Sequence, residues 1–71
     1  MVVTVHLKNG KEVLLENFKH IETTEPITGK EVILNSTSDI IWNRYTSLVF
    51  ICENQKTIFK PEDILFVTEK E

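Results

Sequence analysis

Hydrophobic and polar residues alternate strictly at the start of the chain. The apolar series is Val3, Val5 and Leu7, followed beyond Asn9-Gly10 by Val13 and Leu15. Apolar side chains at every second position place one face of a strand pair against a core and the other face in water. The pattern therefore predicts a β-hairpin over residues 2–15.

The turn of this hairpin can be chosen by comparing the registers that Asn9-Gly10 allows. A two-residue loop would pair apolar with charged side chains on the inner face. A three-residue loop, with Gly10 in the left-handed conformation as a G1 bulge, pairs Val5 with Val13. It also sets His6 opposite Glu12 on the wet face. Because a slip of one residue moves every side chain to the other face, the sequence favours the bulged hairpin.

The rest of the chain divides into short apolar stretches separated by turn-forming residues. Asn17 offers a bend, and further strands are expected at residues 18–24, 31–34, 48–52, 57–60 and 64–67. Proline fits the first position of a helical turn, so residues 61–63 are expected to form one tight turn. The contiguous apolar run at 48–52 indicates a central strand buried on both faces. Residues 68–71 are expected to form a charged, frayed tail.

Residues 39–47 are ambiguous between helix and strand. Ser36, with Asp39 three residues later, resembles a weak capping box that would start a short helix. Two adjacent isoleucines at positions 40 and 41 oppose a helix, and the chain continues directly into the strand at 48–52. A short helix near 39–47 and an extended segment both stay open.

Composition supports a single small β domain spanning residues 1–71. The chain contains no alanine, whereas Val, Ile, Thr and Phe are common, and this bias suits strands rather than helices. Residues 3–21 and 48–67 share one plan of hairpin plus strand. We therefore expect a mainly β fold of about five to seven short strands, either a small antiparallel β-barrel or a two-layer β-sandwich. The plan is similar in architecture to small SH3-like and related barrels, a resemblance that implies no particular activity.

Charge and cysteine content narrow the environment and the partners. The net charge of −3 favours neither a nucleic-acid backbone nor an anionic membrane, since both attract basic surfaces. The single cysteine, Cys52, lies in the apolar run 48–52 and is expected to be a buried, reduced thiol. The sequence shows no apolar leader and no run of about 20 apolar residues. These features predict a cytoplasmic protein without a membrane partner.

No catalytic, metal-binding or phosphate-binding motif stands out. His6 and His20 are not joined by cysteine or aspartate at ligand spacing, so neither a metal nor another cofactor is expected. The serines lack a glycine-rich elbow, and neither glycine belongs to a phosphate-binding loop. We therefore expect a protein that is not an enzyme.

One segment, residues 40–45, concentrates the residue types that dominate protein interfaces. It contains the single tryptophan, arginine and tyrosine of the chain, Trp42, Arg44 and Tyr45. If the segment is extended, Trp42 and Arg44 share one face; the alternative is that Trp42 caps a small core with Arg44 stacked on it. The leading hypothesis is a non-catalytic cytoplasmic module, of the accessory adaptor or inhibitor type, that docks on a protein partner through these residues.

Two other functions compete with this hypothesis. Four lysines of the two hairpins would form a basic edge for nucleic acid if the hairpins lay side by side: Lys8, Lys11, Lys56 and Lys60. The phenylalanines that might stack on bases are expected in the core instead: Phe18, Phe50, Phe59 and Phe66. A self-associating structural subunit is the third hypothesis, because the closing strand at 64–67 has few charges and an open edge would favour a homodimer.

Overall fold

Seven short strands and two single 3-10 turns make up the protein, and no α-helix is present. The computed structural model describes residues 1–71. The strands are β1 (Val2–Leu7), β2 (Glu12–Glu16), β3 (Phe18–Thr24), β4 (Glu31–Leu34), β5 (Leu48–Cys52), β6 (Lys56–Phe59) and β7 (Ile64–Lys70). The 3-10 turns are η1 (Thr37–Asp39) and η2 (Pro61–Asp63). The prediction of a mainly β fold is confirmed.

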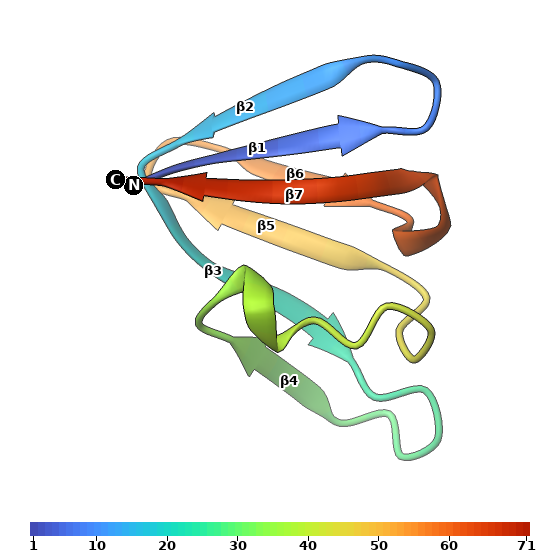
Figure 1. The fold of residues 1–71 in the computed structure, drawn as a ribbon. Coiled ribbons are helices and arrows are strands. Elements are labelled where there is room, and N and C mark those ends of the chain that lie inside the picture. The colour runs from blue at the N-terminus through green and yellow to red at the C-terminus, as the bar shows by residue number, and fades with distance from the viewer.

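The strands form two antiparallel sheets, with the orders β2-β1-β7 and β4-β3-β5-β6. Figure 1 shows the three-stranded sheet in front of β6, with β5, β3 and β4 of the four-stranded sheet below it and both chain termini at one end. The chain passes from one sheet to the other between β2 and β3, at Asn17. No hydrogen-bonded ladder joins an edge of one sheet to an edge of the other, so the strands do not close into a barrel.

The first hairpin has the bulged register that the sequence favours. Val5 lies opposite Val13, and His6 lies opposite Glu12. Gly10 has a φ of 91°, in the left-handed region that a G1 bulge requires. The inner face of the pair is therefore purely aliphatic, as the alternation predicts.

One hydrophobic core receives side chains from both sheets. Val3, Val5, Leu15 and Ile64 enter it from the three-stranded sheet, and the four-stranded sheet supplies Phe18, Ile21, Leu34, Leu48, Phe50, Cys52 and Phe59. Phe50 is fully buried, with its ring 5.3 Å from the ring of Phe59 in an edge-on arrangement. Burial raises the pKa of the Cys52 thiol and so keeps it protonated. The prediction of a buried, free cysteine is confirmed.

Two expectations from the sequence are wrong in detail, and the choice left open at residues 39–47 is decided. The short helix near 39–47 does not form: Ser36 caps only η1, with its Oγ accepting from Ser38 N–H at 3.2 Å, and the next residues turn without helical repeats. β5 is an interior strand, but Val49 and Ile51 on its outer face are only half-buried. The tail is not frayed, since β7 stays paired with β1 as far as Lys70.

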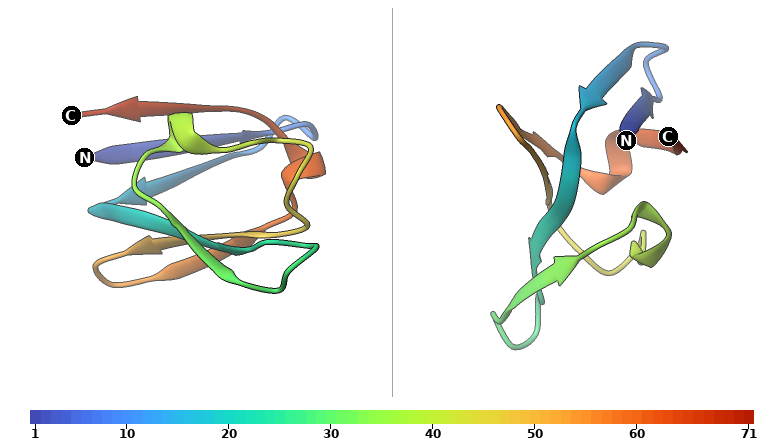
Figure 2. Two further views of the ribbon diagram at one scale, coloured as in Figure 1. Left: turned by 90° about the horizontal axis from the view of Figure 1, so that it is seen from below. Right: turned by 90° about the vertical axis from the view of Figure 1, so that its left-hand side faces the viewer.

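Residues 35–47, between β4 and β5, form a second connection between the two sheets and are called the crossing segment. Figure 2 shows this segment running from β4 to η1, which lies next to β7, before the chain returns to β5. Ile40, just after η1, is buried in the shared core. This crossing segment therefore covers the side of the core below the open edge of β7. No helix in the structure has the length and apolarity needed to cross a membrane.

Asn17 supplies the backbone conformation that joins the two sheets. Its φ of 55° makes it the one residue other than glycine with a left-handed backbone. Replacing it by a β-branched residue is therefore expected to strain the corner: Asn17→Val should lower the free energy of unfolding by about 2 kcal/mol, and Asn17→Gly should change it by less than about 1 kcal/mol. Urea unfolding followed by tryptophan fluorescence measures both. Asn54→Val, in an exposed turn, is the control, and equal effects at both sites would contradict a special role for the corner.

Candidate protein-interaction surface

The segment that holds Trp42 and Arg44 forms a turn instead of an extended strand. The backbone N–H of Arg44 donates to the carbonyl of Ile41 at 3.1 Å. This turn directs Trp42 and Arg44 to different neighbours, and no cation–π contact joins them. The structure thus separates two side chains that an extended segment would have placed on one face.

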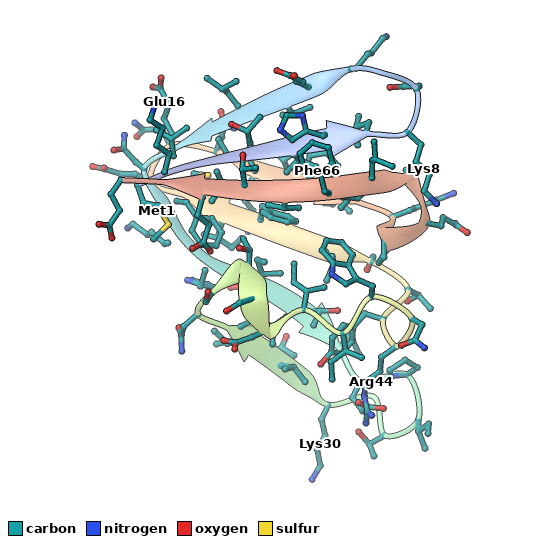
Figure 3. The ribbon with its side chains drawn as sticks, in the orientation of Figure 1. Met1, Lys8, Glu16, Lys30, Arg44 and Phe66 are labelled. Carbon is teal, nitrogen blue, oxygen red and sulfur yellow. The ribbon has the colours of Figure 1, made fainter.

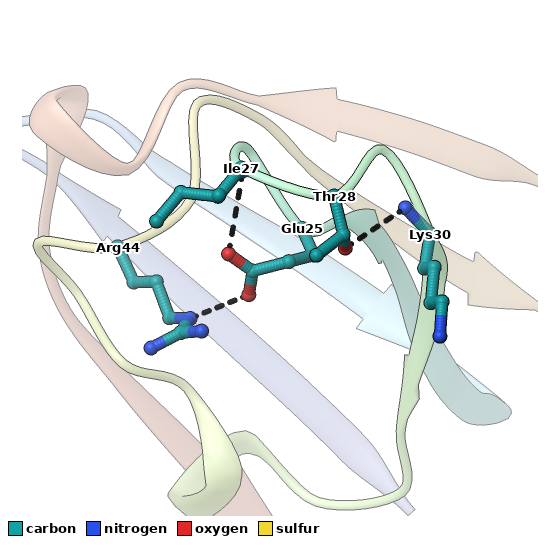
Figure 4. Close-up of polar contacts among 5 residues, drawn as sticks. All are labelled: Glu25, Ile27, Thr28, Lys30 and Arg44. Atoms are coloured by element: carbon teal, nitrogen blue, oxygen red, sulfur yellow. Dashed lines mark hydrogen bonds and ion pairs between the residues drawn. The ribbon is translucent and has the colours of Figure 1, made fainter.

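Arg44 holds the crossing segment against the β3–β4 loop. Its Nε donates to Glu25 Oε2 at 2.6 Å, and the second carboxylate oxygen of Glu25 accepts from Ile27 N–H at 3.4 Å (Figure 4). The hydrogen bond from Arg44 lowers the pKa of the Glu25 carboxyl, and the same bond raises the pKa of Arg44. The Arg44 side chain is 49% exposed and that of Glu25 only 13%. Arg44 therefore links two loops, and its charge is already paired.

Tyr45 and Trp42 have different roles on the two sides of this turn. Tyr45 is half-buried and packs against the core. Trp42 is 43% exposed. Of the three residues that the sequence singles out, Trp42 alone presents a large apolar surface that is free for a partner.

Trp42 lines an open groove that follows the edge of β7. The groove has a volume of about 680 Å³, and its lining includes Trp42, Pro61, Glu62, Leu65, Phe66 and Val67. Leu65 and Phe66 are 61% and 48% exposed, whereas Pro61 is buried. A second depression of about 300 Å³ adjoins it, since Trp42 and Pro61 line both. The indole therefore lies between two connected hollows rather than on a flat surface.

Phe66 is on the surface, and the expectation that it belongs to the core is wrong. Its ring stacks on the ring of His6, with centroids 4.0 Å apart and planes inclined by 18°. His6 Nδ1 in turn lies 3.3 Å from a carboxylate oxygen of Glu12. Phe66 stands opposite His6 across the β1–β7 ladder, so it must share the wet face of His6. Phe18, Phe50 and Phe59 are buried as expected.

The turn η1 forms the far wall of the groove and is attached to β7 through Glu69. Glu69 Oε1 accepts from Thr37 N–H at 2.9 Å and from Thr37 Oγ at 2.5 Å. Ser36 Oγ donates to the same oxygen at 3.4 Å. These hydrogen bonds, chiefly those from Thr37, lower the pKa of the Glu69 carboxyl. The loop thus contacts a β7 side chain and leaves the β7 backbone open.

The four hairpin lysines do not lie along one edge. Lys8 and Lys60 line one depression together with Asp63, at the end where β7 begins. The tip of the β5–β6 hairpin lies at the opposite end, where Glu53 N–H donates to the Asn17 carbonyl. Lys56 follows that tip, so it is distant from the other three. Figure 3 shows Lys8 at the end of the molecule away from the termini.

The two histidines lie in different sheets and each pairs with a local glutamate. His20 Nε2 is 3.0 Å from Glu22 Oε2, and both belong to β3. No group of three or more histidine, cysteine, aspartate or glutamate side chains could hold a metal ion. Each histidine therefore forms a pair with one glutamate and belongs to no larger cluster of ligand side chains.

Comparison with protein-family models, with curated proteins and with solved structures finds no match. The surface has to be interpreted from its own residues. The sequence singles out residues 64–67 only as an edge for self-association, and it does not identify Leu65 and Phe66 as exposed side chains beside Trp42. The one signal for them was the wet-face position of His6, combined with a register for β7 that the sequence does not provide.

The Arg44–Glu25 ion pair is expected to order the crossing segment rather than to stabilise the whole fold. Exposed ion pairs contribute little to global stability, so Arg44→Gln should barely change the unfolding midpoint. It should increase amide hydrogen exchange at residues 40–46 by roughly threefold to tenfold, because the turn loses a restraint. Lys30→Gln, at a neighbouring exposed lysine without an ion pair, is the control. Exchange that is unchanged in Arg44→Gln would contradict this role.

The Glu69–Thr37 contact makes a pH-dependent contribution with a definite sign. The folded-state pKa of Glu69 lies below its ordinary value of 4.5, so the stabilisation is complete above that pH. It is lost as the pH falls through the lower folded-state pKa. Because the carboxylate is exposed, Glu69→Gln should lower the melting temperature at pH 7 by only roughly 2–4 °C.

The same difference should shrink towards zero as thermal melts are repeated at decreasing pH below the ordinary carboxyl range. Glu71→Gln, at an exposed residue near the end of the same chain, controls for the loss of one negative charge. A difference between Glu69→Gln and the wild type that stays constant with pH would show that the carboxylate is not the stabilising group.

Proposed function

We propose that this protein is a non-catalytic interaction module that docks on another protein through the groove beside β7. The observation that carries the proposal is the position of Trp42, 43% exposed over a concave surface that also presents Leu65 and Phe66. Tryptophan combines a large apolar area with a polar N–H group, and it is enriched among residues that dominate binding energy. The two sheets, sharing one core as a small β-sandwich would, serve as the scaffold.

The surroundings of Trp42 support docking because they fix the indole in place. Arg44 ties the segment to Glu25 on one side, and Thr37 ties it to Glu69 on the other. A side chain on a segment held at both ends loses less conformational freedom when a partner binds. The backbone that carries the exposed aromatic group is thus restrained before the partner arrives.

The outer face of the four-stranded sheet is the main competing surface. Ile33 and Ile58 are exposed there, in one row across the sheet with Glu22 and Val49. Each row of side chains on this face also includes a charged residue. In this row, Glu22 lies between Ile33 and Val49. Buried interface centres are depleted of charged residues, so this flat face suits a partner less well than the groove.

Capture experiments with matched variants test the proposal. The tagged wild type, Trp42→Ala and Ile58→Ala are incubated with lysate, and bound proteins are quantified by mass spectrometry. Ile58 is 70% exposed on the other sheet, so its truncation controls for the loss of exposed apolar area. We expect Trp42→Ala to retain the circular dichroism of the wild type and to lose at least about tenfold of a partner that Ile58→Ala still captures. Equal capture by all three proteins would refute docking at this groove.

A further inference from the structure

We propose that the open edge of β7 binds an extended segment of a different polypeptide by strand addition, inside the groove beside Trp42. The bound segment becomes a fourth strand of the sheet β2-β1-β7. Main-chain hydrogen bonds hold it, and alternate side chains select it. This inference rests on the docking function proposed above and specifies its geometry and the chemistry of the partner.

The backbone N–H and carbonyl groups of Val67 have no partner strand, as the alternation of hydrogen bonds along the sheet shows. Leu7 N–H donates to the Lys11 carbonyl at 2.8 Å, so the backbone groups of Leu7 point to β2. Because these groups alternate along a strand, those of His6 point to β7, where its partner is Phe66. The groups of the next residue, Val67, then point to the open edge. No backbone group of a turn or loop forms a hydrogen bond with the N–H or the carbonyl of Val67.

β7 is also the least protected of the four edge strands. β2 carries Glu12 and Glu16, while β4 and β6 are only four residues long and each begins with a charged residue, Glu31 or Lys56. Proteins commonly protect sheet edges with charge and short length. β7 has seven residues, and its first four, Ile64–Val67, are uncharged. The part of this edge that borders the groove, Ile64–Val67, is therefore uncharged, and the charged residues Glu69 and Lys70 lie beyond it.

The walls of the groove define the side chains that an added strand would carry. Side chains of a strand alternate between the two faces of its sheet. On the outer face, the added strand would extend the exposed apolar surface of Phe66 (Figure 3). On the inner face, it would meet Val67 and Trp42. Apolar residues at alternate positions are thus required in the segment.

Charge complementarity argues for a basic segment from another protein. Glu62 lines the groove, and Asp39 and Asp63 are its neighbours at the ends of η1 and η2; none of the three forms an ion pair. Lys8 is the one basic residue in the lining. A second copy of this chain would bring together two molecules of net charge −3, each with Glu62 in the lining of its groove. An extended segment with lysine or arginine beside its apolar residues meets this surface better.

The first experiment uses a displayed library of random nonapeptides as the probe, selected against the full chain at low salt. Enriched peptides are resynthesised in two forms, each N-methylated at every second amide. Strand addition predicts that one form binds at least about tenfold more weakly, because its hydrogen bonds to β7 are lost, and that the other binds within about twofold of the parent. Equal binding by both forms, or no enrichment of alternating apolar peptides, would overturn the inference.

Protein variants test the same edge from the other side. Val67→Pro removes the outward N–H and replaces a half-buried valine side chain that packs against the core. Proline is tolerated in an edge strand at such a position. It should weaken binding of the enriched peptides at least about fivefold, whereas Ile58→Pro, which removes an outward N–H in a different edge strand, should not. Should either variant fail to fold by circular dichroism, the paired N-methylated peptides still decide the question with the wild-type protein.

Charge reversal tests the chemistry of the partner. The library selection is repeated on Glu62→Lys and on Glu53→Lys, which have the same net charge and differ in position. Peptides enriched on Glu53→Lys should keep their lysine or arginine residues, whereas those enriched on Glu62→Lys should replace them with acidic residues. Identical basic peptides from both variants would refute the role of Glu62.

These outcomes separate the mode of binding from the docking function itself. If capture from lysate depends on Trp42 while N-methylation has no selective effect, docking stands and strand addition is wrong. If Trp42→Ala has no effect on capture, the docking proposal fails. A concentration-dependent dimer in sedimentation that Val67→Pro abolishes would identify a second copy as the occupant and overturn the assignment to a different polypeptide.

Discussion

A single thin core has to hold both sheets of this protein together, and that constraint determines where function can lie. Twelve buried residues form the core, and both sheets contribute to it. A chain of 71 residues buries a smaller share of its surface than a larger domain does, so few inward positions can be given to polar chemistry. Thr23 shows the exception, because its buried hydroxyl is satisfied by the Ser47 carbonyl at 2.7 Å. The groove lined by Trp42 lies at the edge of β7 rather than within this core.

Local alternation predicted the parts of the fold in which one face is apolar and the other polar. The register of the first hairpin follows from Val5, Val13 and Gly10, since a two-residue loop at Asn9-Gly10 would pair apolar with charged side chains on the inner face. The four consecutive apolar residues Ile64–Val67 do not specify which side chains face the core, because either alternate pair could do so. The position of Phe66 is decided by its pairing with His6 on a distant strand. Sequence reasoning therefore placed the phenylalanine in the core, whereas it is 48% exposed.

The candidate surface was predictable in composition but not in geometry. Trp42, Arg44 and Tyr45 stand out because their residue types are scarce in this chain and enriched in interfaces. Their separate roles arise from contacts across 19 residues to Glu25 and across the fold to the core. Neither contact leaves a local pattern in the sequence. The helix suggested at 39–47 failed for a related reason, because tertiary contacts at Ile40 and Arg44 outweigh a weak capping signal.

The hydrogen bonds that fix the crossing segment at its two ends also explain why this segment does not cover the edge of β7. Thr37 reaches the Glu69 side chain and Arg44 reaches Glu25, so the segment is fixed at both ends by bonds that use no β7 backbone group. Between these attachments the segment stands away from β7 by the width of the groove and holds Trp42 over it. A loop that bonded directly to the Val67 backbone would have protected the edge in the way that most proteins protect theirs. The arrangement instead keeps the exposed side chain of Trp42 beside unpaired backbone groups, and the proposed strand addition uses both features.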